Sequence, residues 1–103
     1  MAREQLKTLT EPMYYVLLAL KEPLHGYGIM QTVSAMTGGR LNIGAGTLYA
    51  LLARFEREGA VSLTGEEGRR KIYVLTEQGR ALLDREYLRL KELVAAYIKQ
   101  LLI

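Results

Sequence analysis

The chain has 103 residues, of which 50% are hydrophobic and 24% charged, a composition typical of one folded domain rather than a disordered segment. It contains no cysteine and a single histidine, which excludes a disulfide framework, a thiol nucleophile and an ordinary zinc site. The net charge of +3 permits an anionic partner without requiring one. No apolar run has the length of a membrane span, and residues 1–10 are polar. We therefore expect a soluble, cytoplasmic protein that is not an enzyme and needs no metal or cofactor.

Two helices are predicted in the first 40 residues. The first, residues 13–20, is apolar on almost all sides and must be buried. Thr10 is placed to cap its first turn. The second runs over about residues 25–36 and ends at the pair Gly38-Gly39.

The third predicted helix carries the clearest pattern. Its apolar residues recur at helical spacing and form one buried stripe: Leu48, Leu51, Leu52 and Phe55. The opposite face and its shoulder hold Thr47, Tyr49, Ala50, Ala53, Arg54 and Arg57. Small alanines allow close approach to another surface, and the polar side chains can donate to phosphates and base edges. The alternative is that this face is only a solvated helix surface.

A β-hairpin is predicted next, with strands at 61–64 and 72–75 and a polar turn at 65–68. Arg69, Arg70 and Lys71 precede the second strand and suit a phosphate backbone. The alternative is that these cations protect the sheet edge from pairing with other chains.

The order of three helices and a hairpin is typical of a winged helix-turn-helix, in which the third helix enters the major groove of DNA. The sequence thus predicts an α+β fold, mostly α, with a DNA-binding domain at residues 1–75 and a C-terminal helix at 76–103. A winged helix that binds another protein instead of DNA is the alternative function.

The C-terminal helix is expected to begin after Thr76, which can cap it. A heptad seam follows at Leu83, Tyr87, Leu90, Val94, Tyr97 and Leu101. This seam either packs on its own domain or joins two copies, and we expect a two-fold homodimer because little of the domain is left to cover it.

Three stretches in this order resemble the PadR family of winged-helix transcriptional regulators. They are Leu24-His-Gly-Tyr27, Gly46-Thr-Leu-Tyr49 with Phe55-Glu-Arg-Glu-Gly59 after it, and Arg70-Lys-Ile-Tyr73 leading to Leu75-Thr-Glu-Gln-Gly-Arg80. The resemblance covers about Leu9 to Arg80, and the single C-terminal helix is similar to the compact subgroup of that family.

The resemblance implies a cytoplasmic regulator, mostly of the repressor type, that binds palindromic double-stranded DNA as a homodimer and releases it on a small-molecule or other signal. It implies that Thr47, Tyr49 and Ala50 face DNA. By helical spacing Arg54 lies on the shoulder of the same helix, and we expect it to bind DNA as well. The resemblance also implies that Arg69, Arg70 and Lys71 form the wing, and that His25 and Tyr27 lie at the start of the second helix, near the DNA backbone or the helix core.

The chain departs from the family pattern at two points. Gly28 stands where an acidic residue is frequent, so any contact made by that acid is absent. Members that stack flat aromatic drugs use tryptophan, and this chain has none. A small aromatic effector would therefore have to stack on Tyr14, Tyr15, Tyr87 or Tyr97, whose alternative role is interface packing.

Overall fold

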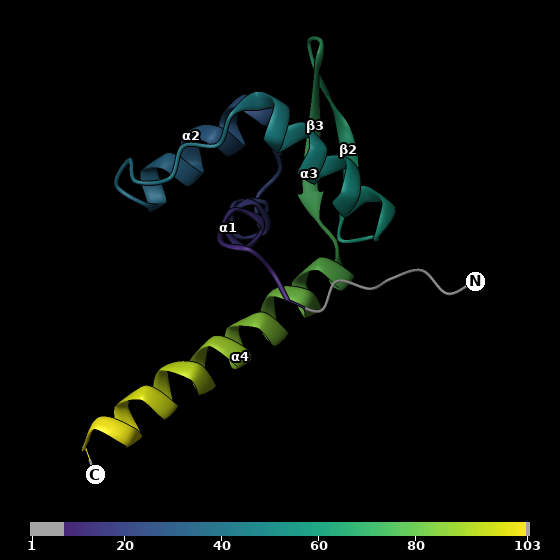
Figure 1. Ribbon diagram of the computed structural model, residues 1–103. Helices are drawn as coiled ribbons and strands as arrows, with labels where there is room; N and C mark the ends of the chain where they lie inside the picture. The colour runs from purple at the N-terminus through teal and green to yellow at the C-terminus, as the bar shows by residue number, and fades with distance from the viewer. Residues whose placement is uncertain (1–7, 103) are drawn as a thin grey trace.

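Figure 1 shows the computed structural model, which describes residues 8–102. The described elements follow in the order α1 (Glu11–Ala19), β1 (Leu24–His25), α2 (Gly26–Met36), α3 (Ala45–Arg57), β2 (Val61–Glu67), β3 (Arg70–Leu75) and α4 (Glu77–Leu102). This is the mostly helical α+β fold that the sequence predicts. The polar start of the chain, residues 1–7, lies outside the described residues.

The predicted helix boundaries are set by local hydrogen bonds and glycines. Thr10 Oγ1 accepts from the Met13 amide at 3.3 Å and caps α1. Thr76 Oγ1 accepts from the Gly79 amide at 3.0 Å and caps α4. Gly38 and Gly39 follow α2 with φ of 61° and 81°, a conformation that disfavours other residues and so ends the helix.

The core lies where α1 passes between the other helices (Figure 1). Val16, Leu17 and Leu20 are fully buried there, as the all-round apolar sequence of this segment requires. On α3 the predicted stripe is buried at Leu48, Leu52 and Phe55, whereas Leu51 is only partly buried. The stripe fixes which face of α3 remains outside.

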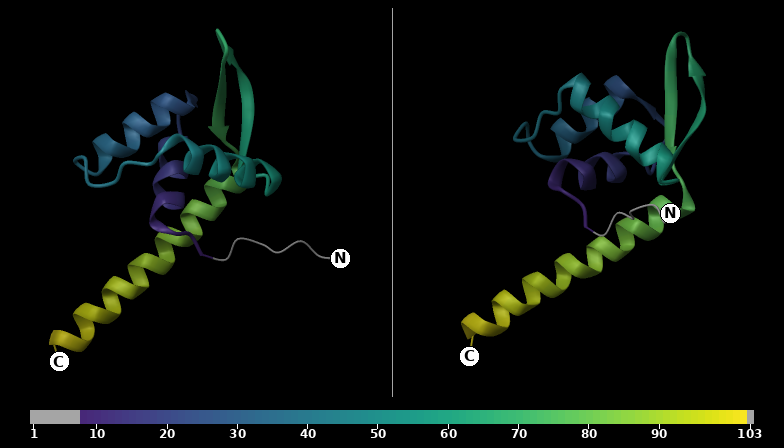
Figure 2. Two further views of the ribbon diagram at one scale, coloured as in Figure 1. Left: turned by 45° about the horizontal axis from the view of Figure 1, so that its top comes forward. Right: turned by 45° about the vertical axis from the view of Figure 1, so that its right-hand side comes forward.

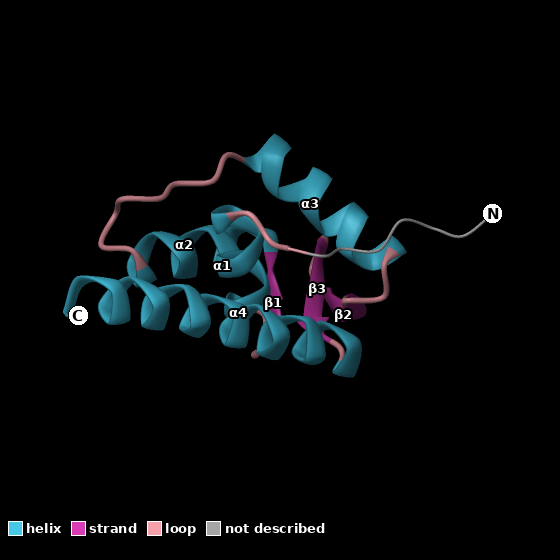
Figure 3. Ribbon diagram, turned by 60° about the horizontal axis from the view of Figure 1, so that its bottom comes forward, coloured by secondary structure: helices cyan, strands magenta, loops and turns pink. Residues whose placement is uncertain are grey.

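The sheet has three antiparallel strands in the order β1-β3-β2, so the prediction of a two-stranded hairpin was incomplete (Figure 3). β1 pairs Leu24 with Tyr73 and His25 with Ile72. A strand of two residues has no periodic pattern, which is why the sequence did not reveal it. Its pairing ties the start of α2 to the base of the wing.

The turn of the wing was predicted in the wrong place. β2 continues through Glu67, and the turn consists of Gly68 and Arg69 instead of residues 65–68. Gly68 has a φ of 64°, which suits a tight turn. A register shift between Leu63 and Gly65 accommodates Gly65 within the strand.

The strand pairing of the wing sets acidic residues opposite its cations. Glu66 pairs with Lys71 and Glu67 with Arg70. Opposite charges at paired positions stabilise an antiparallel hairpin. They also reduce the positive field of the wing.

Helix α4 is attached to the domain only through its first turns. Leu82, Leu83 and Glu86 are buried, whereas every residue from Lys91 to Leu102 is exposed. Figure 2 shows in both views that the C-terminal half projects away from the rest of the chain. The placement of Leu83 in the seam between two copies needs correction, because this side chain is covered by its own domain. No helix within residues 8–102 combines the length and apolar character needed to cross a bilayer.

Candidate nucleic-acid interface

The outward face of α3 carries the residues that the sequence predicts there. Thr47, Tyr49, Ala50, Ala53 and Arg54 are all exposed. The face is held outward because the opposite stripe of the helix is buried in the core. It combines small side chains with hydrogen-bond donors, which suits close approach to a groove.

Tyr49 reaches from α3 to the start of α2. A Cβ placed on Gly26 would lie 2.5 Å from the Tyr49 hydroxyl oxygen and 2.9 Å from its Cζ. The ring therefore covers the backbone of Gly26 while its residue stays 51% exposed. The absence of a side chain at Gly26 is what allows this contact, a role that the sequence pattern alone did not reveal.

Three side chains meet where α2 begins and the wing starts, and we call them the wing-base cluster: His25, Tyr27 and Arg70. His25 Nδ1 accepts from the Gly28 amide at 3.0 Å and caps α2. Arg70 Nη1 lies 3.2 Å from His25 Nε2. The Tyr27 ring stacks on the imidazole with ring centroids 6.5 Å apart. The guanidinium carbon of Arg70 lies 5.8 Å from the centroid of the Tyr27 ring.

The wing-base cluster and the face of α3 form one connected surface. Gly26, which Tyr49 covers, lies between His25 and Tyr27 in the chain. The three wing cations do not act as one group, however. Arg69 is in the turn, and the consecutive strand residues Arg70 and Lys71 point to opposite faces of the sheet. Only Arg70 belongs to the cluster.

Two buried side chains of the domain, Tyr73 and Glu86, have shifted pKa values. Burial raises the pKa of Tyr73, because it disfavours the phenolate, and the negative charge of Glu56 adds to the shift. The pKa of Glu86 is lowered chiefly by its hydrogen bonds from Arg89, against the opposing effect of burial, with help from the Leu9 amide. Arg89 donates to Glu86 from Nε at 2.9 Å and from Nη2 at 2.7 Å. This buried carboxylate joins α4 to the segment before α1.

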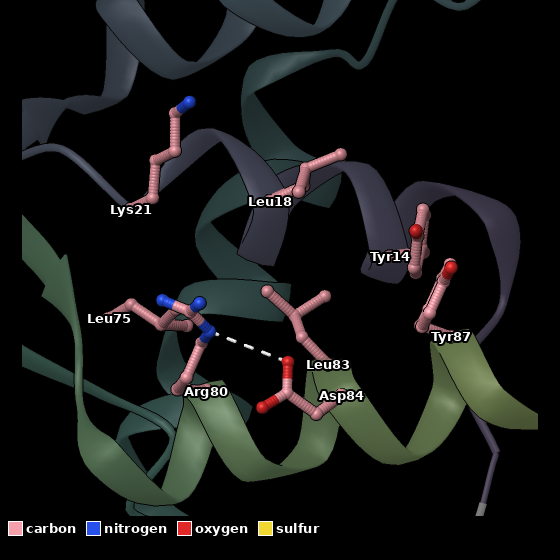
Figure 4. A pocket seen from close by; sticks show the side chains of 8 residues that line it. All are labelled: Tyr14, Leu18, Lys21, Leu75, Arg80, Leu83, Asp84 and Tyr87. Carbon is pink, nitrogen blue, oxygen red and sulfur yellow. Dashed lines mark hydrogen bonds and ion pairs between the residues drawn. The ribbon is translucent and has the colours of Figure 1, made fainter.

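A pocket of about 260 Å³ lies between α1 and α4, on the side of α4 that faces the domain (Figure 4). Its lining residues are Tyr14, Leu18, Lys21, Leu75, Arg80, Leu83, Asp84 and Tyr87. Figure 4 shows the two tyrosines at one end and Lys21 and Arg80 at the other. Arg80 donates to Asp84 at 3.4 Å, so its charge is partly offset. The sequence did not point to the charged end, because these residues come from separate elements.

The four tyrosines predicted to contact an effector are not all brought together. Tyr14 and Tyr87 share the pocket, while Tyr15 packs edge-on against Tyr14 with centroids 5.8 Å apart. Tyr97 lies three turns of helix beyond Tyr87 by sequence, is 68% exposed and does not line the pocket. Within residues 8–102 no three metal-binding side chains are grouped as a metal site would need.

Comparison with known proteins identifies a family and a relative that this chain matches over most of its length. Residues 16–85 match the transcriptional regulator PadR-like family. The chain is 46% identical over 72 residues to a 37.1 kDa protein in transposon TN4556 of Streptomyces fradiae, a match that takes in 69% of this chain and 20% of that protein. This chain therefore spans about a fifth of the length of the Streptomyces protein.

Solved structures resemble the whole arrangement of helices and wing. A PadR-like transcription factor from Bacteroides fragilis superposes with a TM-score of 0.73 at 31% identity, over 85% of this chain and 87% of that chain. A PadR family transcriptional regulator from Eggerthella lenta gives a TM-score of 0.69 at 31% identity, over 88% and 80%. The chain therefore belongs to the PadR-like family of transcriptional regulators, which are DNA-binding proteins and not enzymes.

Proposed function

We propose that this chain represses transcription by binding a palindromic operator as a homodimer in the cytoplasm, with α3 in the major groove. The observation that carries the proposal is the connected surface of α3 and the wing-base cluster. Ala50 and Ala53 leave room for a groove wall, and Thr47, Tyr49 and Arg54 surround them with donors. A dimer bound across a promoter would repress by occupying it.

The wing contributes backbone contacts in this proposal. Arg69, Arg70 and Lys71 are exposed and would interact mainly with phosphates, which lie along any DNA sequence. The paired glutamates of β2 reduce this attraction. Sequence preference would therefore come from α3 rather than from the wing.

An apolar stripe of α4 that its own domain leaves largely uncovered supports the homodimer. We call this stripe the α4 seam; it consists of Tyr87, Leu90, Val94, Tyr97 and Leu101. Tyr87, Val94 and Leu101 recur every seven residues and are 53%, 59% and 64% exposed. Seven-residue spacing keeps these side chains on the face that a second helix would cover. A two-fold dimer would place two α3 helices about one turn of DNA, or a multiple of it, apart.

Relief of repression would act through the pocket between α1 and α4. Its aromatic end offers Tyr14 and Tyr87 to a flat molecule. Tyr14 belongs to α1 and Tyr87 to α4, so a molecule bound between them would contact both helices. A small aromatic effector bound there would change the angle between α4 and the domain, and so the spacing of the two α3 helices.

The operator model is tested by footprinting on the promoters of its own and the adjacent genes, followed by binding at several salt concentrations. Ala50→Leu should weaken binding to the protected site by more than tenfold, as a bulky side chain blocks the groove, and should affect random duplex little. Ala35→Leu, at an exposed position on α2, is the matched control. If no upstream site is preferred over random duplex and Ala50→Leu has no effect, the fold serves instead as a protein-interaction module.

A further inference from the structure

His25 has a hydrogen-bond donor at each of its ring nitrogens. The Gly28 amide donates to Nδ1 at 3.0 Å, which caps α2. On the other side, Nη1 of Arg70 lies 3.2 Å from Nε2. A guanidinium group has only N–H donors and no acceptor. The imidazole therefore lies between two donors.

No protonation state of the ring satisfies both neighbours. A neutral imidazole has one N–H group and one lone pair, and a protonated ring has two N–H groups. The Gly28 amide belongs to the first turn of α2, where backbone donors need an external acceptor. The contact with the Gly28 amide therefore favours the tautomer with the lone pair at Nδ1 and the hydrogen at Nε2. The Nε2–H group then faces the guanidinium of Arg70, donor against donor.

An anionic oxygen placed beside both groups would resolve this conflict. We propose that His25 and Arg70 together bind one backbone phosphate of duplex DNA, with Nε2–H and the guanidinium both donating to its oxygens. The inference rests on the DNA binding proposed above and identifies which phosphate contact is built into the fold. Arg70 supplies the charge and His25 a directed neutral hydrogen bond.

Tyr27 holds this pair in place before DNA arrives. Its ring stacks on the imidazole at an interplanar angle of 19° and also lies under the guanidinium. The pairing of His25 with Ile72 in the sheet fixes the backbone at the same point. Both donors are thus positioned by packing rather than by the ligand, which lowers the entropic cost of binding a phosphate.

The tautomer can be read directly, because His25 is the single histidine of the chain. Isotope-labelled histidine gives one pair of ring nitrogen signals in nitrogen–proton correlation spectra at mildly alkaline pH. We expect a protonated Nε2 and an unprotonated Nδ1 in the free protein. On adding duplex DNA of arbitrary sequence, the Nε2 proton should shift downfield as it binds phosphate. A protonated Nδ1 in the free protein would overturn the proposal.

Paired substitutions measure the contribution of the two donors. In His25→Asn the side-chain oxygen still caps α2 while the Nε2–H donor is lost. We expect about tenfold weaker binding to fluorescein-labelled random duplex, as for a hydrogen bond to a charged group, with the salt dependence unchanged. Arg70→Gln should weaken binding and lower the slope of log affinity against log salt by about one.

The double variant distinguishes a shared phosphate from two separate ones. When Arg70 is already Gln, His25→Asn should cost little more, because the phosphate is no longer held. Arg69→Gln, in the turn of the wing, is the matched control. When it is combined with His25→Asn, the fold-loss of affinity in the double variant should equal the product of the two single losses. The proposal is overturned if the fold-losses of affinity also multiply when His25→Asn is combined with Arg70→Gln.

Two further outcomes separate this proposal from the proposed function. If wild-type protein binds duplex and His25→Asn binds it equally well, only the shared phosphate is wrong and the histidine is merely a cap. If wild-type protein binds no duplex, both proposals fail. Circular dichroism of each variant verifies the helix content, and the exposed Arg70→Gln variant keeps the salt test independent of α2 stability.

Discussion

The hydroxyl of Tyr49 on α3 lies over the backbone of Gly26 on α2, at 2.5 Å from where a Cβ on Gly26 would stand. The contact couples α3, which is proposed to enter the groove, to the start of α2, which lies beside the wing-base cluster. It depends on a missing side chain at one position and an aromatic ring at the other.

Gly26→Ala should therefore weaken DNA binding more than it weakens folding. The new methyl group displaces the end of Tyr49, a half-exposed side chain that can move at little cost to stability. We expect several-fold weaker binding to duplex and a change in the free energy of unfolding of less than about 1 kcal/mol. Anisotropy and denaturant titration measure the two effects. When Tyr49 is already Ala, Gly26→Ala should change binding no further, and a persisting loss would show that the contact is unimportant.

Gly79→Ala should destabilise the fold. A Cβ at Gly79 would overlap the backbone carbonyl of Ala60 and a methyl group of Leu75, and the backbone cannot yield as a flexible side chain can. Overpacking of this kind costs about 1–3 kcal/mol, to be measured by urea denaturation. Gly46→Ala is the matched control, as a Cβ there meets open space and alanine favours the helix by up to about 1 kcal/mol. Equal stability of the two variants would contradict this view of the junction between β3 and α4.

The ion pair between the buried Glu86 and the partly exposed Arg89 should make stability depend on acid. Because the pKa of Glu86 is lowered in the folded state, its ionised form stabilises the fold above the ordinary value of 4.5, and this contribution is lost as pH falls through the lowered pKa. Glu86→Gln should cost about 1–2 kcal/mol at neutral pH and progressively less in acid. Urea denaturation of the wild type and of Glu86→Gln, from neutral pH to below the ordinary carboxyl value of 4.5, tests this difference in the free energy of unfolding.

Asp84→Asn provides the control for that series. Asp84 lies on the same helix and pairs with Arg80, but its side chain is 68% exposed. An exposed pair contributes at most about 1 kcal/mol. An acid dependence in Glu86→Gln as steep as that of the wild type would show that another carboxylate is responsible.

The α4 seam should determine the oligomeric state without affecting the fold of the monomer. Val94→Lys with Leu101→Lys places charges in an apolar interface, so sedimentation should show monomers where the wild type is dimeric at micromolar concentration. Both positions are exposed in the single chain, so circular dichroism should be unchanged. Glu92→Lys, away from the seam, should remain dimeric. A monomeric wild type would rule out the interface.

The pocket predicts which tyrosines an effector would touch. Titration of planar phenolic and cationic compounds, followed by tyrosine fluorescence, should give binding that Tyr14→Ala or Tyr87→Ala weakens about tenfold. Tyr97→Ala should leave the affinity unchanged, because Tyr97 lies outside the pocket. The opposite order of effects would place the effector farther along α4.

The sequence determined much of the helical framework. Thr10, Thr76 and the pair Gly38-Gly39 act through neighbours in the chain, so their capping and turn roles could be predicted from local chemistry. The buried stripe of α3 follows from its periodicity, and with it the outward face of Thr47, Ala50 and Arg54. The exposure of these residues was therefore predictable, whereas their contact with DNA remains a prediction.

The tertiary structure decided which distant residues meet. The two-residue strand β1 is too short for any periodic signal and exists only because β3 pairs with it. That pairing brings His25 beside Arg70, 45 residues later in the chain. The turn of the wing lies at Gly68 and Arg69 because β2 keeps pairing with β3 through Glu67, past a register shift between Leu63 and Gly65 that the local sequence does not predict. Leu83 fits the heptad seam as well as Val94 does, but the packing of the first turns of α4 against α1 and β3 buries Leu83 and leaves Val94 exposed. Local sequence specifies spacing along each element, but the contacts between elements depend on their packing in three dimensions.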